Sequence, residues 1–108
     1  MTAFWSAGQS AEVRSEDSDM VIALCLAAAS QGDINALFDL GVACSTGSHG
    51  VRSDMIEAHK WFNLAASRGH EAAKQCRADI SDEMTAREIA EAQRRARAWL
   101  AETGRRAA

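Results

Sequence analysis

A five-residue phrase occurs twice in this chain, and the spacing of its copies limits the fold more than any other feature. Ala-Ala-Ser-Gln-Gly at 28–32 returns as Ala-Ala-Ser-Arg-Gly at 65–69, and Ala36 returns as Ala73 at the same shift of 37 residues. A fixed period of about 20 to 50 residues is typical of repeat proteins in which each unit is one supersecondary element. The sequence therefore predicts an all-α chain of stacked helix pairs.

Composition agrees with this prediction. The 108 residues include no proline, 47% are hydrophobic and 25% are charged, which suits one modest helical domain. No apolar run is long enough to span a bilayer, and the first residues lack the basic and apolar regions of a signal peptide. We therefore expect a cytoplasmic protein that is not bound to a membrane. The initial Met1 favours a complete chain rather than a fragment.

The net charge of −3 conceals an asymmetry. Residues 1–84 carry six basic and twelve acidic side chains, a net charge of −6, whereas residues 85–108 carry six Arg and three Glu, a net charge of +3. A solvated terminal helix explains this pattern most simply, and a basic patch for an acidic partner is the alternative. Because Glu interrupts the Arg residues, we do not expect nucleic acid as a partner.

Capping residues and glycines divide the chain into five expected helices. Ser18 and Asp54 suit N-caps, Thr85 and Glu88 form a capping box, and Glu57 has the spacing to reach back to the amide of residue 54. Glycines 32, 69 and 104 are expected to end helices. The expected ranges are 19–31, 33–45, 54–68, 71–83 and 85–104. A flexible tail over 1–17 precedes them, and its Phe4-Trp5 pair either docks on a partner, packs loosely on its own domain or is disordered.

Helical spacing selects one inner face in each expected helix. Gly41 lies inside a helix, where it costs about 1 kcal/mol relative to Ala, so we expect a neighbouring helix to approach it closely. His59 is expected at the surface. Three cysteines make an odd count, which favours small buried side chains over a disulfide framework and leaves one bridge open. The inner faces comprise Met20, Val21, Leu24, Cys25 and Ala28; Ile34, Leu37, Leu40, Gly41 and Cys44; Ala58, Trp61, Phe62, Ala65 and Ala66; Ala72, Ala73, Cys76 and Ile80; and Ile89, Ala92, Ala96, Trp99 and Leu100.

The packing and turn residues of the segment 36–69 resemble one full Sel-one-like repeat, a family related to tetratricopeptide repeats. Three positions depart from the family pattern. Cys44 stands where Tyr is usual, the glycine loop has one extra residue, and Ala78 stands where Gly is expected. The matching positions are Ala36, Leu40, Gly41, Gly47, Gly50, Asp54, Ala58, Trp61, Phe62, Ala65, Ala66 and Gly69.

The resemblance implies a short right-handed α-solenoid of about five antiparallel helices. Its repeat domain would cover 18–104, with the clear repeat at 33–69, capping helices at 70–104 and a tail at 105–108. One helix pair cannot bury its own apolar face, so neighbouring pairs must stack on it. An imperfectly capped end exposes apolar surface, which makes a homo-oligomer an alternative.

The same resemblance implies a non-catalytic adaptor that binds a protein or peptide segment in a concave groove, with no cofactor. The first helix of each pair lines such a groove, and an aromatic anchor beside a carboxylate suits a helical or extended peptide. The alternative for Phe38 is that it packs on the first helix. The implied binding residues are Asn35, Phe38, Asp39, Val42 and Ser45.

Two other classes of function compete with the adaptor. Some members of the resembled family have been linked to β-lactam hydrolysis, but the chain has no Ser-x-x-Lys, and His70-Glu71-x-x-Lys74 replaces the second ligand of a zinc motif with Lys. A Cys44–His49 nucleophile pair stays open, although no activating group is evident. The third class is a small structural homo-oligomer whose groove is filled by its own tail or by a second copy.

Overall fold

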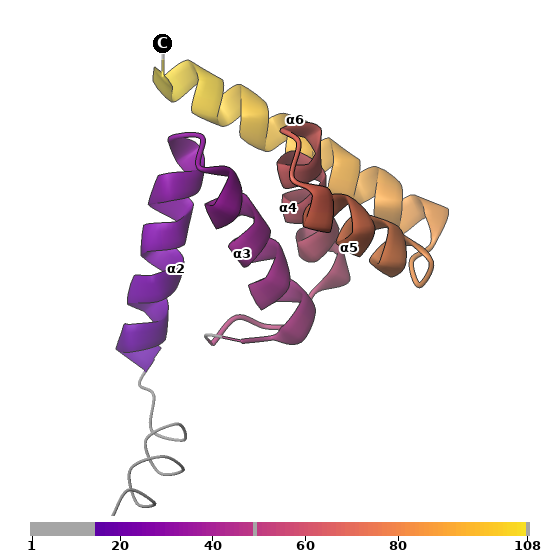
Figure 1. Cartoon of the computed structure of the whole chain (residues 1–108), viewed down its shortest axis with the longest axis horizontal. Helices are drawn as coiled ribbons and strands as arrows, with labels where there is room; N and C mark the ends of the chain where they lie inside the picture. Colours follow the sequence, from indigo (N-terminus) through magenta and orange to yellow (C-terminus); the bar gives the residue numbers. More distant parts are fainter. Residues whose placement is uncertain (1–14, 49, 108) are drawn as a thin grey trace, which may run out of the picture.

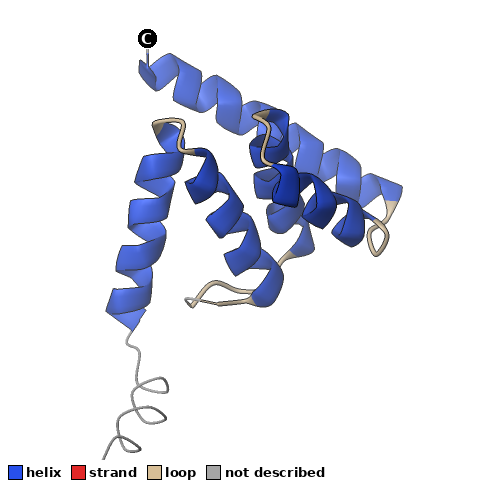
Figure 2. Cartoon of the chain, viewed as in Figure 1, coloured by secondary structure: helices blue, strands red, loops and turns tan. Residues whose placement is uncertain are grey.

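The chain folds into helices only, over the residues that the structure describes. This computed structural model describes residues 15–48 and 50–107, and the side chains of residues 20–48 and 50–104. Over these residues there are five α-helices and no strand (Figures 1 and 2). The all-α prediction is confirmed. The helices are α2 (Ser15–Ser30), α3 (Ile34–Thr46), α4 (Met55–Ser67), α5 (Glu71–Ser81) and α6 (Ala86–Ala107).

Helix α4 is the centre of the fold. It packs against α3, α5 and α6, whereas α2 lies at one end of the array and packs mainly against α3 (Figure 1). Most of α4 is buried, and Phe62 and Leu37 are the largest side chains that are almost fully enclosed. None of the described helices is long and apolar enough to cross a bilayer.

The sequence repeat is also a repeat of local structure. Between α2 and α3 the amides of residues 31, 32 and 33 donate to the carbonyls of 28, 29 and 28. Between α4 and α5 the amides of residues 68, 69 and 70 donate to the carbonyls of 65, 66 and 65. Gly32 and Gly69 have φ values of 94° and 97°, a region that glycine enters without strain. The same turn therefore closes two helices 37 residues apart.

Most expected caps form, with two corrections. Ser18 does not cap the first helix, because α2 begins at Ser15 and Ser18 lies inside it. Thr85 and Glu88 exchange the two hydrogen bonds of a capping box, at 2.9 and 3.1 Å. Asp54 accepts from the amides of residues 56 and 57. Glu57, however, does not reach back to the cap. Its carboxylate binds Lys60 at 2.8 Å and Arg95 at 2.7 Å, because these cations compete for it, and the Arg95 contact joins α6 to α4.

The close approach expected at Gly41 is confirmed. A Cβ placed on Gly41 would lie 2.5 Å from Cδ1 of Phe62, so the aromatic ring occupies the space that any side chain would need. The missing side chain lets α3 and α4 come together here. The inner faces predicted for these two helices are also confirmed, apart from Ile34, which is half-buried.

The predictions for the first and last helices need correction. Helix α2 starts at Ser15, so residues 15–17 are helical rather than tail, and α6 continues through Gly104 to Ala107, since Gly104 does not take the positive φ that ends a helix. Residues 1–14, including Phe4-Trp5, lie outside the described residues. Several expected inner residues are exposed because α2 packs mainly on α3, while Ala72 and Leu100 turn away from α4. The exposed ones are Met20, Val21, Leu24, Ala72 and Leu100.

Candidate partner-binding surface

Helix α3 carries the predicted binding residues, and both of its ends are capped. The Asp33 carboxylate accepts from the amide of Ala36 at 3.2 Å, and Gly47, with a φ of 76°, closes the other end. Asn35 and Asp39 are exposed, whereas the remaining predicted residues of this helix are half-buried. The five predicted residues thus differ in how far a partner could reach them.

Phe38 packs on α4 and α5. Its ring stacks on the His70 imidazole, with centroids 4.3 Å apart and planes 14° apart, and it lies 5.7 Å from the Phe62 ring. His70 is itself held, because its Nδ1 accepts from the amide of Ala73 at 3.1 Å. Phe38 therefore links α3 to the start of α5, and only part of its ring remains open to a partner.

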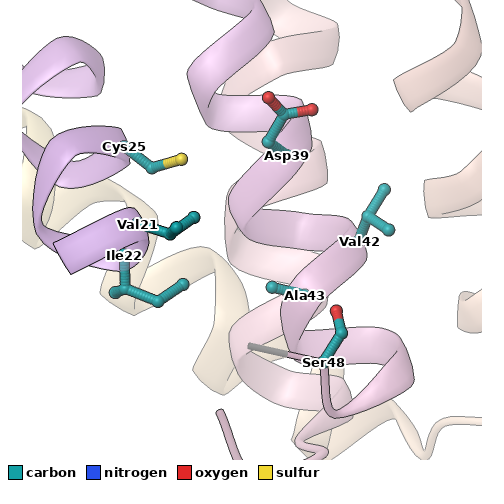
Figure 3. Close-up of a pocket in the computed structure, with 7 residues that line it drawn as sticks. All are labelled: Val21, Ile22, Cys25, Asp39, Val42, Ala43 and Ser48. Carbon is teal, nitrogen blue, oxygen red and sulfur yellow. The ribbon is translucent and has the colours of Figure 1, made fainter. Parts of the chain in front are cut away.

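A hollow of about 290 Å³ lies between α2 and α3. Figure 3 shows Cys25 directed from α2 toward α3, with Asp39 and Val42 on the α3 side. Asp39 is the only ionisable carboxylate among the lining residues, and the others are mainly aliphatic. The lining residues are Val21, Ile22, Cys25, Asp39, Val42, Ala43 and Ser48.

The hollow includes two of the five predicted binding residues. Asp39 and Val42 line it together, whereas Asn35, Phe38 and Ser45 do not. The Ser45 hydroxyl donates to the carbonyl of Val42 at 3.0 Å, so this donor is used within the helix. The contribution of α2 was not expected, since sequence reasoning assigned the groove to α3 alone.

A second hollow, of about 450 Å³, joins the first and last described helices. Leu26, Ala27 and Ser30 of α2 face Trp99, Glu102 and Thr103 of α6 across it. No local pattern in the sequence predicts this approach, because the two segments are about seventy residues apart and are brought together by α3 and α4, which pack between them.

The thiols are poorly suited to nucleophilic chemistry. Burial raises the pKa of Cys44 to about 11, with a smaller contribution from Glu57. Burial, followed by Asp39 and Asp33, also raises the pKa of Cys25. Since the thiolate is the reactive form, these shifts make both thiols less nucleophilic at neutral pH. All three cysteines, including Cys76, are free thiols, and His49, the other half of the pair considered above, lies outside the described residues.

His59 is buried rather than at the surface, which corrects the prediction. It is 3% exposed, and its Nε2 lies 3.1 Å from the Ser81 hydroxyl. That hydroxyl donates to the carbonyl of Arg77 at 2.7 Å, which leaves its oxygen to accept from Nε2–H, the arrangement of the neutral tautomer with its proton on Nε2. Nδ1 has no hydrogen-bond partner within the described chain. Burial, and then the nearby Arg77 charge, lowers the pKa of His59 below its ordinary 6.5.

We therefore expect the protein to lose stability as pH falls below about 6.5. The unfolded chain takes up a proton at residue 59 near that pH, whereas the folded chain resists until the lower pKa is reached, so the loss runs between these two values. Residue 59 alone changes the free energy of unfolding by at most about 1.4 kcal/mol per pH unit. Urea midpoints between about pH 5 and 8 measure it.

His59→Gln is the control for this prediction, because an amide can still donate to Ser81 but does not titrate. His49 and His70 are common to both proteins, so the difference between the two pH profiles reports residue 59. If the profiles are parallel, burial of a neutral imidazole at this position contributes nothing to the pH dependence.

No protein-family model, no curated protein and no solved structure matches this chain. Among the described residues, no group of three or more His, Cys, Asp and Glu side chains is placed to hold a metal ion.

Proposed function

We propose that this protein is a non-catalytic interaction module that binds a peptide segment of another protein between α2 and α3. The observation that carries the proposal is the hollow in which aliphatic side chains of both helices surround a single carboxylate, that of Asp39. Ligand sites are typically concave and apolar, with a few polar groups that fix orientation. The raised pKa of Cys25, the one cysteine among the lining residues, favours binding over nucleophilic chemistry at this place.

The proposal includes a Sel-one-like architecture, a short right-handed solenoid of helix pairs. The recurrence of one turn, with the same hydrogen bonds, after 37 residues supports it. Gly41 and Ala58 allow α3 and α4 to approach, and Trp61 and Phe62 fill the space between neighbouring helices. In this architecture α3 would be the groove-lining helix of its pair, and α4 the outer one.

The chemistry of the hollow defines the kind of segment that fits. An aliphatic or small aromatic side chain would enter between Val21, Ile22 and Val42, where it leaves water. A lysine or arginine one helical turn away would reach Asp39, which is exposed. We therefore expect an amphipathic segment with one apolar anchor and one basic residue, in a helical or extended form.

Selection from a random peptide library displayed on phage tests this proposal. Peptides enriched on the wild-type protein should combine an apolar anchor with a basic residue. Their affinity should fall at least about tenfold for the double variant Asp39→Lys/Val42→Asp. The first change reverses the charge at residue 39, and the second places a carboxylate in the apolar wall of the hollow. Amide chemical shifts should change mainly along α2 and α3 when such a peptide is added.

Asp79→Lys provides the matched control. Asp79 is exposed on α5 and pairs with Gln75 of its own helix, so the same reversal of charge occurs away from the hollow. The control variant should bind the selected peptides like the wild type. Peptides that bind the double variant and the wild type equally well would show that the hollow is not the binding site.

A further inference from the structure

One face of α2 is apolar and uncovered by the rest of the described chain. Met20 and Leu24 on this face are 59% and 63% exposed, whereas Ala29 on the side toward α3 is 1% exposed. Residues 20–29 include no charged side chain. A helix that is apolar on all sides is normally an interior helix. The residues that point away from α3, called here the outer face of α2, are Met20, Ala23, Leu24 and Ala27.

A comparison of α2 with α4, its counterpart in the repeat, shows which contact α2 lacks. At the shift of 37 residues, Leu24 corresponds to Trp61 of α4. Trp61 is 4% exposed because α6 covers it, and its ring meets that of Trp99 with centroids 5.5 Å apart. Helix α4 is enclosed by three helices, whereas α2 packs mainly against one (Figure 1). The outer face is therefore built like a packed surface, but no described helix packs on it, although Ala27 at its edge also borders the hollow shared with α6.

We propose that a second copy of this protein covers the outer face, with the two α2 helices packed antiparallel about a twofold axis. Met20, Leu24, Ala27 and Gln31 follow one another at spacings of four, three and four residues, the pattern of a helix–helix seam. An antiparallel crossing near Leu24 sets each Met20 opposite Ala27 of the other copy. Large side chains then meet small ones, and the two leucines meet at the axis.

The charges at the two ends of α2 select the antiparallel arrangement. Its first turns contain Glu16, Asp17 and Asp19, and residues 15–31 include no basic residue. At the other end, the Arg68 guanidinium lies 3.5 Å from where a Cβ on Gly32 would be. Antiparallel packing brings the acidic end of each helix next to Arg68 of the other copy and opposes the helix dipoles.

Other arrangements of the outer face fit these charges less well. A parallel pair would place six carboxylates together, and an anionic membrane surface would repel the same acidic turns. Asp33 also lies at the carboxyl end of α2, but its side chain is engaged as the N-cap of α3. The outer face and the hollow lie on different sides of α2, so the pairing does not depend on the proposed function and leaves the hollow open.

Sedimentation equilibrium of the full chain between about 1 and 100 µM tests the pairing. We expect the wild type to be a dimer at the upper end of this range. Leu24→Asp should raise the dimer dissociation constant at least about 30-fold, since the change occurs twice at the centre of the interface. Leu100→Asp is the matched control, because Leu100 is an exposed leucine on α6, and this variant should still dimerise. Circular dichroism verifies that both variants keep their helix content.

A charge exchange tests the orientation. Glu16→Lys and Arg68→Glu should each weaken the dimer severalfold, and the double variant should recover most of the wild-type affinity. If the double variant is weaker than either single one, the antiparallel orientation is wrong.

Three results would overturn the proposal as a whole. They are a wild type that stays monomeric at the highest concentration, a dimer that Leu24→Asp leaves unchanged, and a monomeric wild type that dimerises only when residues 1–14 are deleted. The last of these would identify residues 1–14 as the cover of the outer face.

Discussion

Replacing Gly41 with leucine should lower the free energy of unfolding by about 3 kcal/mol or more. A Cβ at this position already lies 2.5 Å from the Phe62 ring, and leucine adds three further carbons. The ring has little room to retreat, because Phe62 is 2% exposed and lies against Phe38 on α3. Either α3 and α4 separate or Phe62 leaves its place. Urea denaturation followed by the helical signal at 222 nm measures the loss.

Gly104→Ala is the control for this prediction. Gly104 is also inside a helix, but nothing lies within 4 Å of a Cβ placed on it. Alanine there should stabilise the protein by up to about 1 kcal/mol, because only the helix preference of the residue changes. Gly41→Ala should fall between the two, on the destabilising side. A Gly41→Leu variant with the midpoint of the wild type would mean that α3 and α4 are not in close contact at residue 41.

The turns and caps could be predicted because they depend on neighbours in sequence. Gly32 and Gly69 end helices through their own backbone freedom, and Asp54 and Thr85 cap helices through amides two or three residues away. The buried face of α4 could also be predicted, since its large and small residues alternate with polar ones at helical spacing. Such features need no knowledge of which helices become neighbours.

The orientation of α2 could not be predicted, because it depends on which helices become its neighbours. Residues 20–29 are apolar in every direction, so helical spacing does not distinguish the side toward α3 from the outer face. His59 shows the same limit, because its burial depends on Ser81, a residue of another helix that happens to offer it a hydrogen bond.

The candidate site could be predicted only on its α3 side. Asp39 and Val42 were expected from the resemblance to a repeat, and both line the hollow. Val21, Ile22 and Cys25 come from α2, and their role depends on the angle between the two helices. That angle is fixed by the turn at Gly32 and by the side chains packed between the helices, and so it is a property of tertiary structure.

Trp61→Ala should be the second large loss, about 3 to 5 kcal/mol, and should exceed the loss from Phe38→Ala. Trp61 is 4% exposed, meets Trp99 edge to face and has the Lys60 ammonium 4.1 Å from its ring centroid, so its removal leaves a cavity between α4 and α6. Circular dichroism should follow unfolding, since the variant also loses one of the three tryptophan fluorophores.

Phe38→Ala should cost about 2 kcal/mol, because part of the ring is already in solvent and only its contacts with His70 and Phe62 are lost. The comparison between the two variants decides what Phe38 does. A loss as large as that of Trp61→Ala would place Phe38 in the core and remove it from the binding surface. A small loss would leave its exposed edge available to a partner, beside the hollow that Asp39 and Val42 line, and peptide affinity of the folded Phe38→Ala protein would then measure its contribution.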